Sequence, residues 1–315
     1  MIKKSSLVAF AGSLLLAASL PMAAAAQDDS KTFYWISHGS PADPVWNYFL
    51  DGANQWADDT GNQVNTSFWS NEVAPQQEAI RTAIAAGADG IVTTVPDPGS
   101  LNEVVDEARA AGIPIININT YDPGANFDSY VGTINEENGR QWAQYLVDGG
   151  YVSEGDFVWM PVEVPGAVYG VDEERGIASV FEPLGIEWEV TDATYEQATV
   201  IDEMVNYLTA NRDKVDAMIG LGDLVTGSVA RVWDQVGVAP GEIPVVGWGN
   251  SVDTAQEIID GYVLAGKWQD PQLTSYLGLT QAYLASEGYP LGFDILVGAL
   301  YEADTAPIYL ETMTQ

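Results

Sequence analysis

Residues 90–118 read GIVTTVPDPGSLNEVVDEARAAGIPIINI, and this stretch decides the fold. Gly90–Val95 is a short apolar run, which predicts a buried strand. Ser100–Ala111 has the composition of a helix, and Gly112 stands where a glycine commonly ends one. Ile113–Ile118 is a second apolar run. A buried strand, a helix and another buried strand in this order predict two parallel strands connected by a helix.

The same alternation extends in both directions from this unit. Further strands are predicted at 32–37, 64–69, 130–132, 156–160, 186–190, 217–221 and 243–248, and further helices at 45–59, 75–86, 172–184, 198–211 and 224–236. The strands lack a polar and apolar alternation, so they indicate parallel sheets covered by helices on both faces. Because the pattern runs through two similar halves, we predict an α/β protein of two doubly wound lobes with a cleft between them. The first crossing between the lobes is expected at 132–134.

The composition excludes several classes of function. The chain has 45 acidic residues against 11 Lys and Arg, a formal net charge of -34, so it lacks the clustered cations that nucleic acid or an anionic membrane surface requires. It has no Cys and one His, which excludes disulfides, thiolate nucleophiles, Cys-ligated zinc and sites built from several histidines. We therefore expect no nucleic-acid partner, no metal and no cofactor. The excess of acids predicts an acidic surface suited to a saline habitat.

The first 26 residues have the organisation of a secretory signal peptide. Lys3 and Lys4 precede an apolar run from Leu7 to Leu20, and small residues follow at Ala23–Ala26. An uncleaved membrane anchor is the alternative, but the run is rich in alanine, is followed by Pro21 and ends in a processing pattern. We expect cleavage near Ala26 and export to the periplasm.

Polar and aromatic side chains follow the predicted strands directly. In open parallel sheets, ligands bind beyond the carboxyl ends of the strands, so these are the candidate ligand contacts. They include His38, Asp43, Trp46, Asn119, Asp223, Trp248 and Asn250. Carboxylates and amides bind hydroxyl groups, and Trp offers a flat apolar face to C–H groups, a combination that suits a small neutral sugar or polyol. No glycine-rich phosphate-binding motif follows any of the strands.

Several short fragments carry a resemblance to a known family. The chain resembles the sugar-type periplasmic binding proteins of bacterial ABC importers, the ribose- and galactose-binding group, over essentially its whole mature length. The fragments are Ser37-His38-Gly-Ser-Pro-Ala-Asp43-Pro44-Val-Trp46, Ala85-Ala-Gly87-Ala-Asp89-Gly90-Ile91, Ala111-Gly112-Ile113-Pro114-Ile115, Glu174-Arg175-Gly176, Val245-Val246-Gly247-Trp248 and Gln269-Asp270-Pro271. Each fragment is weak alone, and their order and spacing make the resemblance specific.

The resemblance implies the type I periplasmic binding fold, with two lobes joined by a three-stranded hinge. Residues 27–133 and 270–294 would form the N-terminal lobe, and residues 134–269 and 295–315 the C-terminal lobe. The chain would cross near Thr133, near Gln269 and a third time near Phe293–Ile295.

The resemblance also implies roles for individual residues. Asp43 and Trp46 would supply a polar contact and ring stacking from the first lobe, and Asn119 would bind sugar hydroxyls. Arg175 would grip hydroxyls from the second lobe. Gly222-Asp223 matches an Asn-Asp pair of the family, and Gln269 matches a glutamine of the hinge.

The chain departs from the ribose-type pattern at two places. Asn119-Thr120 stands where ribose-type proteins carry Asp-Arg, and Asn250 stands near a position that is Asp in those proteins. The ligand is therefore open among a pentose, a polyol and another small hydroxylated molecule.

Candidate residues could instead have a purely structural role. Trp46 could pack its helix on the sheet, and Trp248 could belong to the core. His38 could be structural, Asp223 could cap a helix, and Arg175 could form a surface ion pair worth little.

Three functions are compatible with these features of the sequence. The leading hypothesis is a non-enzymatic, monomeric receptor that closes on a small neutral sugar or polyol and delivers it to an ABC permease in the inner membrane. An autoinducer-2-like or chemosensory receptor that docks a chemoreceptor is the second, and Gly266-Lys267-Trp268-Gln269-Asp270 is similar to the autoinducer-2 receptor branch. An exported glycoside-acting enzyme is the third, because some pair of carboxylates 5 to 10 Å apart is nearly certain among so many acids.

Overall fold

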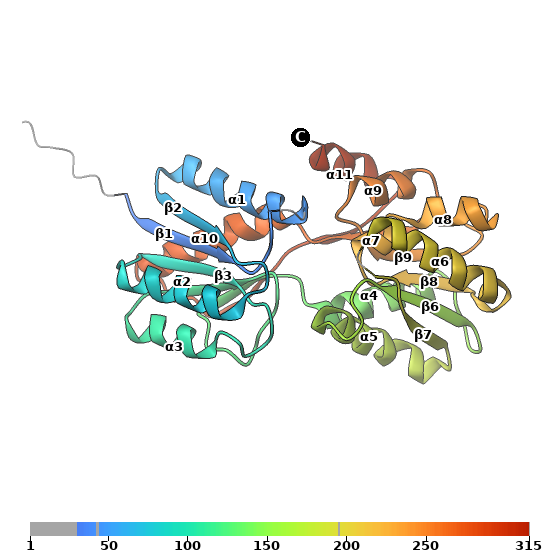
Figure 1. The fold of residues 1–315 in the computed structure, drawn as a ribbon, viewed down its shortest axis with the longest axis horizontal. Coiled ribbons are helices and arrows are strands. Elements are labelled where there is room, and N and C mark those ends of the chain that lie inside the picture. The colour runs from blue at the N-terminus through green and yellow to red at the C-terminus, as the bar shows by residue number, and fades with distance from the viewer. Residues whose placement is uncertain (1–29, 42–43, 195, 315) are drawn as a thin grey trace, which may run out of the picture. The chain divides into compact units, whose positions relative to one another are not determined.

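The computed structural model describes residues 30–41, 44–194 and 196–314. Its first sheet has six strands in the order β11-β5-β4-β3-β1-β2, and every neighbouring pair is parallel (Figure 1). The strands are β1 Thr32–Ser37, β2 Gln63–Phe68, β3 Gly90–Thr94, β4 Ile115–Ile118, β5 Ser129–Gly132 and β11 Ile295–Leu296. Its helices are α1 Pro44–Thr60, α2 Val73–Ala85, α3 Asn102–Ala110 and α10 Pro271–Ser286. Residues 90–118 form β3, α3 and β4, as predicted.

The second sheet also has six strands, in the order β12-β10-β9-β8-β6-β7. They are β6 Phe157–Val162, β7 Glu187–Asp192, β8 Ala217–Gly220, β9 Val245–Trp248, β10 Ala265–Trp268 and β12 Ala299–Glu302. Its helices are α4 Asn135–Asp148, α5 Val168–Phe181, α6 Gln197–Asn211, α7 Asp223–Thr226, α8 Val229–Val236, α9 Val252–Ile259 and α11 Ala306–Met313, with 3-10 turns η1 Glu182–Leu184 and η2 Arg212–Lys214. Among the strands of the described residues, only the edge strand β12 pairs antiparallel, with β10. The predicted α/β class with two parallel-sheet lobes is confirmed.

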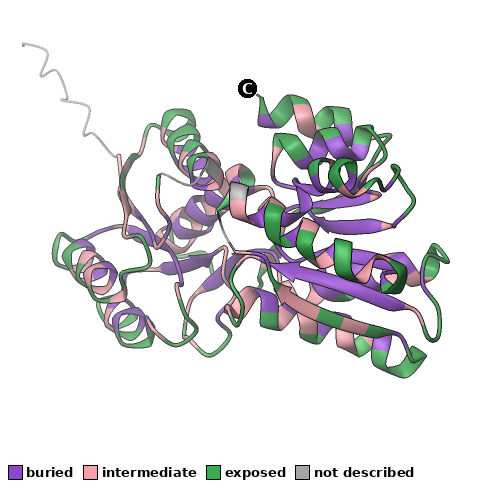
Figure 2. Ribbon diagram, turned by 45° about the vertical axis from the view of Figure 1, so that its right-hand side comes forward, coloured by how far each residue is buried: buried purple, intermediate pink, exposed green. Residues whose placement is uncertain are grey.

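Each sheet has an apolar layer on both faces, because its inner strands bury side chains on both sides. All five residues of β3 are buried, and Figure 2 shows the inner strands as buried and the outer faces of the helices as exposed. In the first lobe, Trp56 and Phe33 pack at the α1 and α10 face, while Ile80 and Val104 pack at the α2 and α3 face. Burial of these apolar side chains is the main favourable term in the stability of each lobe.

Helix α10 belongs to the first lobe although it lies far along the chain. The indole nitrogens of Trp35 and Trp56 donate hydrogen bonds to Ser275 and Thr280 of this helix, at 3.0 and 3.1 Å. In Figure 1 the orange α10 accordingly lies with the blue β1 and α1. A segment from the last quarter of the chain thus completes the core of the first lobe.

The chain passes between the sheets three times. It leaves the first sheet after Gly132, returns after Trp268, and leaves again after Leu296. The last passage follows the predicted position, Phe293–Ile295, because Ile295 and Leu296 pair with β5 at the edge of the first sheet before the chain continues into β12.

The observed helices differ from the predicted ones at two places that concern the site. The helix predicted at 224–236 is interrupted at Gly227-Ser228, which divides it into α7 and α8. A Cβ atom at Gly227 would lie 3.0 Å from the hydroxyl oxygens of Ser251 and Thr254, so this turn approaches α9 closely. Helix α5 begins at Val168 instead of the predicted Asp172, which brings Tyr169 into its first turn. Within the described ranges, no helix is long and apolar enough to cross a bilayer.

Candidate functional site

At the carboxyl edge of the first sheet, an imidazole and an indole pack together. His38 follows β1, and its backbone N–H donates to the hydroxyl of Thr94 at the end of β3, at 2.8 Å. The His38 ring meets the Trp46 ring edge to face with centroids 4.9 Å apart, and Trp46 stacks on Phe49 at 5.0 Å. Gly39 is required beneath the indole, since a Cβ atom there would lie 2.1 Å from Trp46.

This packing determines the charge of His38. Burial lowers the pKa of the imidazole to about 4, although its backbone bond to Thr94 acts in the opposite direction. The Nδ1 atom is buried and has no hydrogen-bond partner. At neutral pH the first edge therefore presents an uncharged ring.

Asn119 follows β4 at the same edge and has a left-handed backbone, with φ 70°. Asn tolerates this conformation better than most residues. The Tyr130 hydroxyl donates to the Asn119 carbonyl at 2.7 Å and fixes the turn, while the Asn119 amide oxygen accepts from the Thr120 hydroxyl at 3.3 Å. The turn holds the Asn119 side chain at the strand end, where the sequence predicted it.

At the carboxyl edge of the second sheet, three of the predicted residues form one hydrogen-bonded chain. The Asp223 carboxylate accepts from the backbone N–H of Asn250 at 2.6 Å and from its side-chain amide at 2.7 Å. The Asn250 amide oxygen accepts from the Gln269 backbone N–H at 2.9 Å. Asp223 thus connects the end of β8 to the end of β9 and, through Asn250, to the hinge after β10. A residue that only capped a helix would not need these contacts.

A fourth predicted residue, Trp248, forms a hydrogen bond with an acid that was not predicted from the sequence. Its indole N–H donates to the Glu173 carboxyl at 2.9 Å, and the indole packs edge to face on Trp142. Glu173 is 0% exposed, and its second carboxyl oxygen has no partner. Burial and the charges of Glu163, Asp172 and Asp223 raise its pKa well above the usual range, against the lowering effect of the Trp248 bond.

Two further residues of this edge, Glu163 and Tyr169, are not among the contacts predicted from the sequence. Glu163 follows β6, and its carboxyl accepts from the Leu224 backbone N–H at 2.5 Å, at the start of α7. Its carboxyl would lie 2.4 Å from a Cβ atom at position 222, so Gly222 is required there. Burial and the charges of Glu163 and Glu173 raise the pKa of the Tyr169 hydroxyl, against the lowering effect of a backbone bond at Val164. We call Glu163, Glu173 and Asp223 the acidic edge.

Arg175 stands apart from these groups. Arg175 lies two residues after Glu173 on α5 and therefore on another face of that helix. Its side chain is 57% exposed and forms ion pairs with Asp172 at 2.8 Å and Glu136 at 3.2 Å, as the surface reading predicted. Asp43 lies outside the described residues. The ligand-binding roles of all nine candidates remain predictions.

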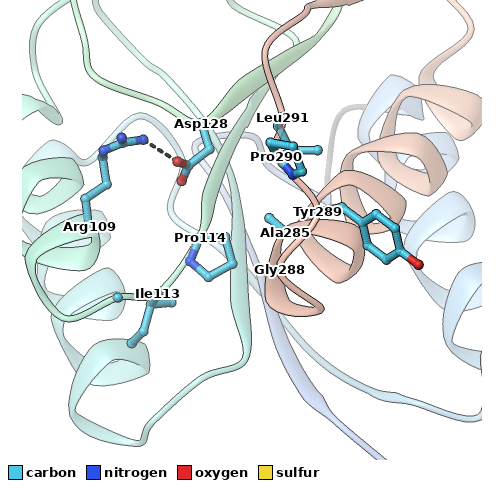
Figure 3. Close-up of a pocket in the computed structure, with 10 residues that line it drawn as sticks. Arg109, Ile113, Pro114, Asp128, Ala285, Gly288, Tyr289, Pro290 and Leu291 are labelled. Carbon is cyan, nitrogen blue, oxygen red and sulfur yellow. Dashed lines mark hydrogen bonds and ion pairs between the residues drawn. The ribbon is translucent and has the colours of Figure 1, made fainter.

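The first lobe also has a cavity away from this edge. This cavity of about 430 Å³ is lined by Ile113 and Pro114, which precede β4, and by Tyr289 and Pro290, with an ion pair between Arg109 and Asp128 at its side (Figure 3). It lies at the amino ends of the strands, opposite to the edge just described. Among the described residues, no group of His, Asp and Glu has the arrangement of a metal site.

The fold and its two polar strand edges define a two-lobed α/β binding protein. Residues 33–290 match the family described as periplasmic binding protein domain, so the chain belongs to this family. It is 27% identical over 267 residues to a xylose/arabinose-binding protein of Sulfolobus acidocaldarius, covering 78% of this chain and 62% of that protein. It is 26% identical over 199 residues to a D-xylose-binding periplasmic protein of Escherichia coli, covering 61% and 58%.

The chain thus spans about three fifths of the length of these two relatives. Among solved structures, the solute-binding protein of an ABC transporter from Burkholderia graminis, in complex with D-arabinose, has a TM-score of 0.75 at 22% identity. The alignment covers 87% of this chain and 96% of that one. This likeness establishes the fold.

Proposed function

We propose that the protein captures a small sugar or polyol between the carboxyl edges of its two sheets and delivers it to an ABC permease. The observation that carries the proposal is the hydrogen-bonded chain of Asp223, Asn250 and Gln269, which ties the ends of two strands to the hinge. A ligand hydroxyl bound to this chain would contact the second lobe and the hinge together, so binding would favour one arrangement of the lobes.

The two edges offer complementary chemistry. The first provides uncharged groups, namely the His38 and Trp46 rings and the Asn119 amide, and the second provides carboxyl groups. Sugars have apolar C–H faces and hydroxyl rims, which aromatic rings and carboxylates respectively recognise. Selectivity would arise because a wrong hydroxyl leaves a buried polar group without its hydrogen bond.

The similarity to xylose-, arabinose- and arabinose-complexed binding proteins supports a pentose or a related sugar as the ligand. The protein would act without catalysis, as an exported periplasmic monomer released by cleavage near Ala26. A lobe division close to residues 133 and 269, with a third passage after Leu296, accords with the sheet order.

A thermal-shift panel tests the proposal. The protein is unfolded and refolded to remove bound ligand, then heated with D-xylose, L- and D-arabinose, D-ribose, myo-inositol, hexoses and amino sugars. At 100 times its Kd, a ligand of the folded state adds about 2.7 kcal/mol of stability, which raises the Tm by several degrees. Absence of a shift with every sugar and polyol would reject the proposal, and turnover of a bound sugar would show an enzyme instead.

A further inference from the structure

The acidic edge surrounds one carboxyl group with like charges. Three acids, Glu163, Asp172 and Asp223, all disfavour ionisation of Glu173. A buried carboxylate is costly unless it is paired, so in the free protein Glu173 holds its proton. A positive charge placed at this edge would remove that cost.

The unpartnered carboxyl oxygen of Glu173 is a second and independent observation. The other oxygen accepts the hydrogen bond of the Trp248 indole N–H at 2.9 Å, which fixes the carboxyl at the end of β9, and Asn250, the partner of Asp223, follows two residues later. The remaining oxygen is fully buried and unpaired. Natural proteins pair nearly all buried polar atoms, so an orphan beside a ligand edge points to a group that the ligand or its water supplies.

The more accessible members of the edge are suited to meet this group. Glu163 and Asp223 are half-buried, and each is held in place by a backbone N–H, Glu163 by that of Leu224 and Asp223 by that of Asn250. They are therefore preorganised acceptors, and both lie close enough to the Glu173 carboxyl for their charges to raise its pKa. The net charge of -34 would in addition favour the approach of cations over anions.

We propose that the ligand presents a positively charged amine to the acidic edge, which makes it an amino sugar or amino polyol. This inference rests on the proposed function and narrows its substrate class. The hydroxyl groups and apolar face of the ligand would be held as described above, and the ammonium group would lie against Glu163 and Asp223. Binding would ionise Glu173 and release its proton.

The test compares matched sugars by isothermal titration at pH 7. D-glucosamine, D-galactosamine and D-mannosamine are each titrated beside the neutral parent hexose and the N-acetyl derivative, which lacks the charge. We expect at least one amine to bind about tenfold or more tightly than its parent, the difference that about 1.4 kcal/mol gives. The advantage should shrink at high salt because screening weakens the attraction.

Two variants identify the groups responsible. Glu163→Gln keeps an oxygen for the Leu224 N–H and removes a charge. It should therefore abolish most of the difference in affinity between the amino sugar and its neutral parent. Glu203→Gln removes an exposed charge from α6 and should change nothing. In Glu173→Gln, the proton release seen in buffers of different ionisation enthalpy should disappear.

The outcomes separate the two proposals. If neutral sugars bind as tightly as their amines, the amine inference is overturned and the proposed function stands. If neither class binds, and the wider panel also fails, the proposed function falls together with the inference. Preferential binding of an amine that Glu163→Gln does not reduce would also overturn the assignment to this edge.

Discussion

The carboxyl edges of the two sheets keep opposite kinds of titratable group uncharged. At the first edge, burial lowers the pKa of His38 to about 4, and a base stays neutral against Trp46. At the second, burial among other acids raises the pKa of Glu173 far above normal, and an acid stays neutral beneath Trp248. One half of the fold thus holds a neutral imidazole against an indole and the other a neutral carboxyl among acids, and each half should lose stability at a different end of the pH scale.

The largest effect is expected from Trp46→Ala at the first edge. Only 8% of Trp46 is exposed, and the indole packs on Gly39, Phe49 and His38. Its removal should lower the free energy of unfolding by about 3 to 5 kcal/mol, measured by urea denaturation. Tyr289→Ala is the control, because this aromatic ring is 62% exposed and should cost less than about 0.5 kcal/mol. A similar small loss for both variants would show that the indole is not part of the core.

His38→Phe tests the response of the first edge to acid. The folded state resists protonation of His38 down to about pH 4, whereas the unfolded chain takes up the proton near pH 6.5, so stability is present above pH 6.5 and is lost as the pH falls. The loss between pH 6.5 and 4 reaches about 3 kcal/mol for this group. His38→Phe keeps a ring against Trp46 and should remove that part of the acid loss in urea titrations across this range. An unchanged acid profile would contradict the assignment.

Glu173→Gln tests the second edge in the opposite direction. Between the ordinary carboxyl pKa of 4.5 and its raised value, the folded protein holds a proton that the unfolded chain has released. Stability should therefore fall with rising pH by about 1.4 kcal/mol per unit for this group. Glutamine keeps the Trp248 bond and should remove this slope. Glu257, with a pKa raised to about 8 by burial, should supply the part of the slope that remains.

The smallest effect on stability is expected from Arg175→Gln. The guanidinium pairs with Asp172 and Glu136 at an exposed position, and such pairs contribute about 0 to 1 kcal/mol. Thermal unfolding should therefore change little. The same variant tests the role that the family resemblance implied, because a tenfold or greater loss of sugar affinity would restore Arg175 to the site.

The sequence predicted the sheets and most of the strand ends because both depend on local patterns. Apolar runs identify the strands, and glycines such as Gly87 and Gly112 mark the helix ends, without knowledge of their neighbours. Tertiary partners were harder to predict. Glu173 is one acid among many in the sequence, and only the contact with Trp248, 75 positions away, distinguishes it. Arg175 attracted attention because cations are rare, although the helix turns it away from the acid that lies two positions before it.

The central claim is that both edges hold the same ligand, and one titration experiment tests it most directly. The tightest ligand of the panel is titrated calorimetrically into the wild type, Asn119→Gly and Asp223→Asn. Glycine keeps the left-handed turn at position 119 and removes the amide, and Asn71→Gly at φ 63° is its matched control. The account predicts that Asn119→Gly and Asp223→Asn each weaken the affinity about tenfold or more and that Asn71→Gly has no effect. Unchanged affinity in either edge variant would contradict a shared site.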